Sequence, residues 1–250
     1  MKKERLFTTL LALTSMVSFV SCSKKENACP EPEPMTDENG CVYVVEKEYE
    51  PGVLPEDSIG GLYTGYINAE NLPSGAGKME YYNSTVYDGR WEEGLWRGYC
   101  KINWDSGCVY IGEAKNSLMH GRGYMKWPMG DYYYGDWREG APNGFGTKGY
   151  MRDGTAESDL YAYDIYTGEM VNNFKVGKGI MRYHFGAIYD GEWQSDQRSG
   201  LGVQYWEDGC EWIKFVGEFA NDWISGRGTM YYADGTVVTG TWSGTEKISD

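Results

Sequence analysis

The residues that could perform catalysis are few in this 250-residue chain, and they do not form a catalytic set. The two histidines, His120 and His184, lie 64 positions apart, and no serine or cysteine is spaced to act as a nucleophile beside either. Two histidines also provide almost no ligands for a histidine-based metal centre. The sequence therefore predicts no catalytic residue, no metal site and no cofactor, and we expect a protein that is not an enzyme.

Two segments resemble ligand-binding loops, but their surroundings argue against both interpretations. Residues 144–149 read Gly-Phe-Gly-Thr-Lys-Gly, a pattern that binds a dinucleotide only between a strand and a helix. Its first two glycines instead belong to a Gly-x-Gly pair that recurs along the chain. Residues 153–164 carry four carboxylates spaced much like those of a calcium loop, but Ser158 stands where that loop requires glycine. We interpret these segments as a repeat strand and a solvated acidic loop.

The charge and the composition limit which partners the protein can bind and which fold it can adopt. Lys and Arg total 23 and Asp and Glu total 37, so the formal net charge is −14. Such a chain is repelled by nucleic-acid phosphates and by anionic headgroups, so we expect no nucleic-acid partner and no polybasic lipid binding. With 35 glycines, 22 tyrosines and 10 tryptophans, the composition disfavours a helical bundle.

Residues 1–21 have the pattern of a bacterial lipoprotein signal peptide. Three basic residues lie within the first five, and an apolar stretch of 16 residues follows, which is short for a membrane-spanning helix. Ser21 directly precedes Cys22, and this ending resembles a lipobox, in which the cysteine becomes the lipidated first residue. Ser23, rather than an acidic residue, resembles lipoproteins sent to the outer membrane. We expect a cell-envelope protein anchored through lipid on Cys22.

Residues 22–62 are predicted to form a tether, because Pro, Glu and Gly dominate this segment. Residues 42–45 could add one strand to a neighbouring sheet. Cys29 and Cys41 flank the Pro-Glu segment, and an oxidising compartment would permit a disulfide between them. The later cysteines fit no metal or redox motif, and we interpret them as free thiols: Cys100, Cys108 and Cys210.

From residue 63 to residue 250 the chain repeats itself. A Tyr-x-Gly unit or its equivalent recurs with a base period of 23 residues, with ten extra residues in the fourth copy and three in the sixth. A Gly-x-Gly pair starts eleven residues after each of the first seven units (twelve in the first copy), with Cys100 in place of the second glycine once, and an aromatic residue follows six residues after the first glycine. The starts of the copies are Tyr63, Tyr87, Tyr110, Tyr133, Tyr166, Tyr189, Phe215 and Val238.

Each copy has the period-2 pattern of two short strands. Tyr133, Gly135 and Trp137 would share one face of a first strand, and the alternate positions are polar. In the second strand Gly144, Gly146 and the later aromatic would share that face, so that a ring could lie against the glycine backbone. The prediction is an all-β fold: an elongated, single-layer antiparallel meander or solenoid of about seven hairpins plus a partial terminal copy.

The repeated unit resembles the MORN repeat. The resemblance is carried by Tyr87-Asp-Gly-Arg-Trp91, Tyr133-Tyr-Gly-Asp-Trp137 and Tyr189-Asp-Gly-Glu-Trp193, each with a glycine eleven residues after its tyrosine. It implies an elongated, twisted β-meander that serves as an interaction or scaffold module. The lipid recognition linked to such repeats does not carry over, because basic residues are not concentrated in this acidic array.

Two functions from different classes fit these features. The first is a protein-interaction module on a lipid-anchored tether, and its binding residues could lie in the insert at about residues 151–165, which includes Leu160, Tyr161 and Tyr163. These three residues could equally fold back over the break in the repeat. The alternative is a carbohydrate-binding surface made by outward-facing tyrosines. Those tyrosines are Tyr66, Tyr124, Tyr134, Tyr205 and Tyr231.

The lipid anchor predicts the behaviour of a single variant. Cys22→Ala removes the only residue that the signal would acylate, so the protein should leave the membrane fraction and become soluble. Immunoblots of fractionated cells measure this, with Ser23→Ala as the control that should stay bound. A Cys22→Ala protein that remains on membranes through detergent-free washes would show that the lipoprotein interpretation is wrong.

Overall fold

The computed structural model describes residues 36–54, 58–159 and 162–250. The predicted signal peptide, the lipidation site at Cys22, and Cys29 lie outside these residues, as do Leu160 and Tyr161 of the insert. Within the described ranges no helix is long and apolar enough to cross a membrane.

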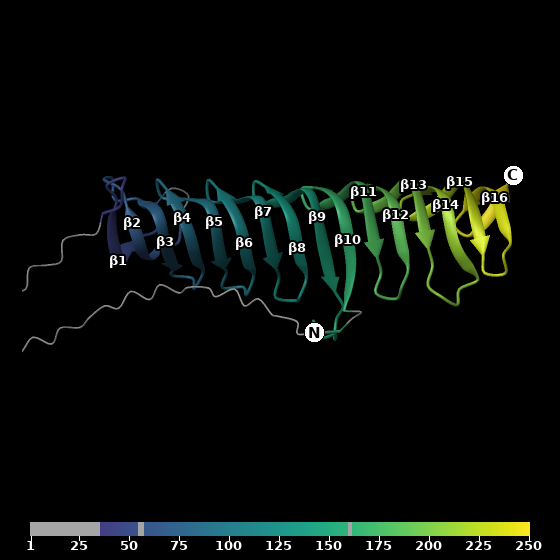
Figure 1. The fold of residues 1–250 in the computed structure, drawn as a ribbon, viewed down its shortest axis with the longest axis horizontal. Helices are drawn as coiled ribbons and strands as arrows, with labels where there is room; N and C mark the ends of the chain where they lie inside the picture. The colour runs from purple at the N-terminus through teal and green to yellow at the C-terminus, as the bar shows by residue number, and fades with distance from the viewer. Residues whose placement is uncertain (1–35, 55–57, 160–161) are drawn as a thin grey trace, which may run out of the picture. The chain divides into compact units, whose positions relative to one another are not determined.

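The described residues form one antiparallel sheet in which every strand pairs with the next one along the chain (Figure 1). This confirms the predicted all-β meander. The strands are β1 (Val42–Tyr49), β2 (Gly61–Ile67), β3 (Pro73–Tyr81), β4 (Val86–Glu92), β5 (Leu95–Asn103), β6 (Val109–Lys115), β7 (Leu118–Lys126), β8 (Tyr132–Arg138), β9 (Ala141–Met151), β10 (Tyr163–Val171), β11 (Phe174–Arg182), β12 (Ile188–Gln194), β13 (Gln197–Tyr205), β14 (Trp212–Ala220), β15 (Trp223–Tyr232), β16 (Val237–Ser243) and β17 (Glu246–Ser249).

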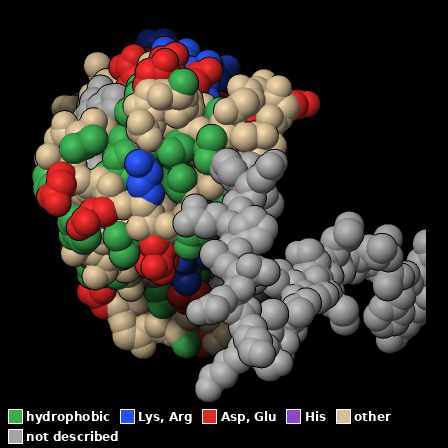
Figure 2. Space-filling view, turned by 90° about the vertical axis from the view of Figure 1, so that its left-hand side faces the viewer, with side chains coloured by type: hydrophobic (Ala, Val, Ile, Leu, Met, Phe, Trp, Pro, Cys, Tyr) green, Lys and Arg blue, Asp and Glu red, His purple; other side chains and the backbone are tan. Residues whose placement is uncertain are grey.

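Strand β1 lies within the predicted tether and extends the sheet before the first repeat. It pairs with β2, and a bulge at Glu46, whose φ is +49°, interrupts the register. Hydrophobic side chains surround a basic one at this end of the sheet (Figure 2), and Val45 and Val53 are exposed there. The bulge and the nearby charges make this edge irregular, which discourages the addition of another strand.

The core is a row of buried side chains on one face of the sheet. The tyrosine that starts each of the first six copies is fully buried. These tyrosines alternate across the sheet with residues of the second strands, and Tyr87, for example, pairs with Met79 and Ile102. Each tyrosine hydroxyl is also satisfied, because it donates a hydrogen bond to the backbone carbonyl three residues ahead; Tyr133 Oη lies 3.0 Å from the Asp136 oxygen. Six copies share this bond, from Tyr63, Tyr87, Tyr110, Tyr133, Tyr166 and Tyr189.

The tyrosine rings lie directly on glycine backbone. Gly135 pairs with Gly146 and then Gly168 in a row that crosses the sheet. A Cβ atom on Gly146 would lie 2.4 Å from the hydroxyl oxygen of Tyr133, too close for any real contact. In the second copy Cys100 takes the place of a glycine in this row, and burial raises its thiol pKa to about 12. The predicted packing of rings on glycine is therefore confirmed for the second glycine of each pair.

The first glycine of each pair has a different role. Gly144 lies opposite the buried Met170 of β10, two positions from Gly146, which agrees with the predicted register. Its φ of +124°, within a bulge of β9 against β8, nevertheless directs its Cβ position to the other face, which the prediction did not include. A Cβ atom there would meet the Asp136 side chain, which lies on the other face, at 2.7 Å. The same carboxylate accepts a 2.9 Å hydrogen bond from the Phe145 N–H. Acidic residues that look merely solvated in the sequence therefore secure the bulge, as Glu113, Glu169 and Glu218 also do.

Tryptophans join the copies in pairs. The indole N–H of Trp137 donates to the Gly123 carbonyl of the preceding copy at 3.1 Å, and Trp91 bonds to Gly77 in the same way. Trp193 and Trp242 make the equivalent bonds from the sixth and eighth copies. The remaining copies carry other residues at this position: Ile67, Ala114, Met170 and Phe219.

The turns after each first strand form a second ladder along the sheet. The turns after β4, β6, β8, β10, β12 and β14 each have two residues with positive φ, such as Asn221 (+50°) and Asp222 (+70°). The N–H of the second turn residue donates to a carbonyl of the preceding copy, and Asp222 bonds to Arg198 at 3.1 Å. Successive hairpin ends are therefore held at a fixed spacing.

The two faces of β9 predict opposite effects for neighbouring substitutions. Gly146→Val would force a branched side chain into the Tyr133 ring, which should destabilise the fold by about 1–3 kcal/mol or more. Thr147→Val changes the other face, where one hydroxyl contact of 3.1 Å to Thr167 is lost, and should cost about 1 kcal/mol or less. Urea unfolding followed by tryptophan fluorescence compares the two variants. Equal losses would refute the face assignment.

Candidate functional site

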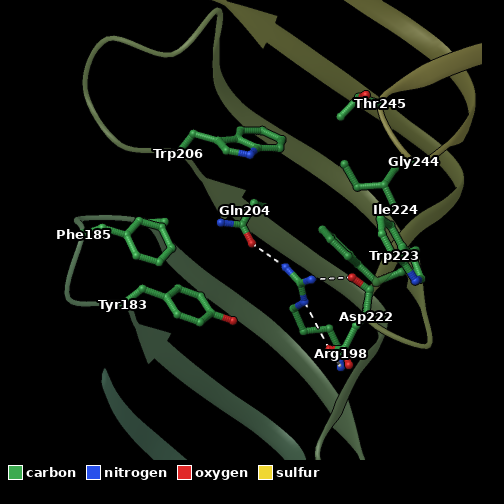
Figure 3. A pocket seen from close by; sticks show the side chains of 12 residues that line it. Tyr183, Phe185, Arg198, Gln204, Trp206, Asp222, Trp223, Ile224, Gly244 and Thr245 are labelled. Carbon is green, nitrogen blue, oxygen red and sulfur yellow. Dashed lines mark hydrogen bonds and ion pairs between the residues drawn. The ribbon is translucent and has the colours of Figure 1, made fainter. Parts of the chain in front are cut away.

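A pocket of about 520 Å³ opens between the two rows of turns near the C-terminal end of the sheet (Figure 3). The loop between β11 and β12 and the loop after β13 supply one wall, and the turns before β15 and β17 supply the other. We call it the aromatic pocket. Its lining residues are Tyr183, Phe185, Ala187, Arg198, Gln204, Trp206, Phe219, Asp222, Trp223, Ile224, Gly244 and Thr245.

The walls of the aromatic pocket present rings to solvent. Tyr183 and Phe185 stack with ring centroids 5.4 Å apart, and Trp206 lies on the next hairpin of the same wall. Phe185 is 49% exposed and Trp223, on the opposite wall, is 71% exposed. So large an exposed fraction for two big aromatic side chains is costly in water and typical of a binding surface.

Arg198 forms the polar centre of the pocket. Its Nη1 donates to Gln204 Oε1 at 2.8 Å, its Nε donates to Asp222 Oδ1 at 3.3 Å, and its Nη2 donates to the Asp222 carbonyl. The guanidinium also lies 5.6 Å from the Tyr189 ring centroid and 5.8 Å from that of Phe219. The Arg198 side chain is 23% exposed, so its charge is compensated by Asp222 rather than by bulk water.

The repeat explains where Arg198 lies and why the pocket is open there. Arg198 is the ninth residue after the start of its copy, a position that is apolar in most copies. In the second copy the same position is Trp96, whose indole stacks on Tyr87 at 4.8 Å and donates to the Tyr81 hydroxyl at 3.0 Å. A smaller hollow lies beside Trp96, and equivalent repeat positions line it. The narrower guanidinium therefore leaves space that an indole fills elsewhere.

Two further cations lie on the same face in neighbouring copies. Lys175 is sandwiched among rings, with its Nζ 5.3 Å from the Tyr150 centroid and 4.9 Å from that of Trp193. Lys148 lies over Tyr150 at 5.2 Å and donates to Asn173 Oδ1 at 2.9 Å. Burial lowers the pKa of both amines, and the Asp196 carboxylate partly offsets this. Three copies in succession thus place a cation against aromatic rings.

The structure separates the tyrosines that were predicted to face outward. Tyr134 is 54% exposed and pairs across the sheet with Tyr124, while Tyr205 and Tyr231 flank Lys214 several strands away. Lys214 Nζ lies 4.5 Å from the Tyr231 centroid. Tyr66, near the other end, contacts the Tyr43 ring at 5.3 Å. These residues therefore form separate groups rather than one continuous platform.

The described part of the insert contacts the turns on both sides of it. Tyr163 donates to the Gly130 carbonyl at 3.3 Å and meets the Tyr132 ring at 5.3 Å. Glu157 forms a 2.5 Å ion pair with Lys126, and Asp164 lies 2.7 Å from His184 Nδ1. These contacts agree with the covering role considered for the insert.

The remaining sequence motifs occupy ordinary positions in the sheet. Residues 144–149 lie within β9, which is followed by a strand rather than a helix. Cys41, Cys100, Cys108 and Cys210 carry free thiols. Among the residues that the structure describes, no group of three or more His, Cys, Asp or Glu side chains could hold a metal ion.

Sequence reasoning missed the aromatic pocket and its central arginine. The available signal was the replacement of an apolar residue by Arg198 at the ninth repeat position, and by Lys175 one copy earlier. A second signal was the presence of two large aromatic residues at turns: Phe185 within the turn between β11 and β12, and Trp223 directly after the turn that precedes β15.

Comparison with known proteins agrees with the architecture. A family model described as "MORN repeat" matches residues 87–109, 110–132, 133–150, 166–184, 189–211 and 215–237. No curated protein sequence matches the chain. Among solved structures, the SAS-4 TCP domain of Drosophila melanogaster, in complex with a proline-rich motif of Ana2, is similar over 78% of this chain and 98% of that one, with 13% identity and a TM-score of 0.36.

The Arg198–Asp222 pair predicts a stability difference within one turn. Asp222→Gly keeps a residue that accepts a φ of +70° but removes the carboxylate that bonds to the Arg198 N–H and Nε, and should destabilise by about 1–2 kcal/mol. Asn221→Gly, at the exposed neighbouring position with φ +50°, is the matched control and should be within about 0.5 kcal/mol of the wild type. Urea unfolding of both variants measures the difference. Indistinguishable variants would mean that the Asp222 carboxylate does not hold Arg198.

Proposed function

Because the chain belongs to the MORN repeat family, we propose that it is a non-enzymatic protein-interaction module whose aromatic pocket binds a segment of a partner protein. Repeats of this family indicate a protein-interaction or membrane-binding module. The observation that carries the proposal is the exposure of Phe185 and Trp223 around a charge-compensated arginine. A net charge of −14 favours a protein over an anionic membrane surface as the partner.

The repeat geometry supports an extended partner segment. The aromatic pocket and the hollow beside Trp96 use equivalent repeat positions, with Tyr183 corresponding to Tyr81 and Trp206 to Trp104. Binding features that recur with the copies suit a partner that runs along the sheet and places a side chain at each one. The polar side chains at the centre of the pocket are already hydrogen-bonded to one another through Arg198, so little ordering of these side chains is needed on binding.

We also propose that this module lies in the bacterial cell envelope, anchored to the outer membrane through lipid on Cys22 and the tether of residues 22–62. Its support is the signal-like sequence of residues 1–21. A carbohydrate-binding surface is the second candidate, and the observation in its favour is that Tyr134 and Tyr205 are 54% and 40% exposed. A glycan array probed with the wild type and with Tyr134→Ala tests that candidate.

Capture of a partner by pocket variants tests the proposed function. The wild-type chain and Trp223→Ala are cross-linked in native membranes, and captured proteins are quantified by mass spectrometry. We expect the captured amount of one partner protein to fall at least tenfold with Trp223→Ala, because a tryptophan anchor that becomes buried on binding contributes about 2 kcal/mol or more. Tyr134→Ala, which removes an exposed ring from the opposite face, is the control and should capture normally.

A second variant separates the pocket from the insert. Replacing residues 151–163 with Pro-Met-Gly, the sequence of the turn at residues 128–130, removes ten residues net and restores the 23-residue period. A pocket-binding partner should still be captured. Loss of the partner by this variant while it remains folded would place the binding surface on the insert, and capture unaffected by Trp223→Ala would contradict the pocket.

A further inference from the structure

The aromatic face of the sheet holds cations in consecutive copies. Lys175, at the ninth position of the fifth copy, lies over Tyr150 from one side and Trp193 from the other, with its Nζ 3.8 Å from Asp196 Oδ1. One copy later Arg198, at the same position, lies over Tyr189 and Phe219 and pairs with Asp222. The repeat therefore builds the same arrangement twice: a cation, flanking rings and an aspartate from the next turn.

The following copy has the rings but lacks the cation. Its ninth residue is Ile224, and the residues equivalent to Tyr150 and Trp193 are Trp206 and Trp242. Arg152 lines a hollow that adjoins the aromatic pocket and shares Trp206 with it, but Arg152 is not among the residues that line the aromatic pocket itself. The aromatic pocket opens at this position, and the indoles of Trp206 and Trp223 are part of its lining (Figure 3).

Carboxylates surround this opening. The Asp222 side chain is 45% exposed. Its Oδ1 accepts hydrogen bonds from the backbone N–H and from Nε of Arg198, so Oδ2 can accept a bond from another donor. Glu207 and Asp208 line an adjoining hollow together with Arg152 and His184, and Phe185 and Trp206 are common to this hollow and the aromatic pocket. Indole faces together with carboxylates attract a cationic side chain, since the ring quadrupole and the negative charge act in the same direction.

The Arg198 guanidinium does not prevent a second cation from binding there. Its charge is already compensated by Asp222 and Gln204 within the pocket. The same face holds Lys148 and Lys175 together, both against the Tyr150 ring at 5.2 and 5.3 Å. Two cations that share one ring show that neighbouring positive charges are tolerated on this face when rings and carboxylates surround them.

We infer that the aromatic pocket recognises a lysine or arginine side chain of an extended partner segment, which takes the place that Lys175 and Arg198 occupy in their own copies. This inference rests on the proposed function, because it names the residue type by which the partner is recognised. The acidic chain, with a net charge of −14, draws such a basic segment toward the pocket.

Selection of peptides by the full-length protein tests the inference. Random 12-residue peptides displayed on phage are selected on the wild type, and those that no longer bind Trp223→Leu are sequenced. Lysine or arginine should be enriched over aspartate and glutamate at one position. Replacing that residue by norleucine in a labelled synthetic peptide should raise the Kd by about two- to thirty-fold in fluorescence anisotropy, the range expected for a cation on an indole.

Matched variants identify the groups responsible. Trp206→Leu and Trp223→Leu keep apolar volume but remove the π face. Each should weaken binding of the lysine peptide more than binding of the norleucine peptide. Tyr99→Leu, which changes a residue that is 65% exposed away from the pocket, is the control and should weaken neither.

The outcomes separate the two proposals. Pocket-dependent peptides that carry an acidic or uncharged residue at the fixed position would overturn the cation assignment and leave the protein-interaction function intact, as would an unchanged Kd for the norleucine peptide. Failure to select any pocket-dependent peptide would overturn both. Self-association of the unliganded protein that Trp223→Leu abolishes, seen in sedimentation, would assign the pocket to a second copy and also overturn the peptide inference.

Discussion

The contact of a tyrosine ring with bare glycine backbone is the interaction on which this structure depends. A single-layer sheet has no second layer to cover its apolar face, so each copy must bury its own large side chain. The ring of Tyr133 does so by lying on Gly135 and Gly146, where any side chain would collide with it. The tyrosine hydroxyl then bonds to the backbone of its own strand, so the burial leaves no polar atom unpaired.

The aromatic pocket follows from how the strands depart from a regular ladder. The bulge at the first glycine, held by a carboxylate such as Asp136, redirects the chain without breaking the sheet. The hairpin turns then stack through backbone bonds such as that from Asp222 to Arg198. Together these features bring residues from four successive copies around one pocket, and they hold its aromatic side chains partly in water.

The sequence alone predicted the all-β meander, the 23-residue copies and the burial of the starting tyrosines, because spacing and period-2 alternation report directly on these features. It did not predict the Cβ direction at Gly144, because counting alternate positions assumes extended backbone and Gly144 has a φ of +124° within a bulge. It also missed the pocket. Tyr183 and Asp222 look ordinary within their own copies, and only the stacking of copies places them beside Arg198.

The tryptophan bonds divide the array into units larger than one repeat. Indole bonds join the first copy to the second, the third to the fourth, the fifth to the sixth and the seventh to the eighth, whereas the junctions between these pairs carry Ala114, Met170 or Phe219. In the language of a one-dimensional Ising chain, the coupling alternates between strong and weak. Cooperative opening then proceeds in blocks of two hairpin copies, with boundaries that fall at the weak junctions.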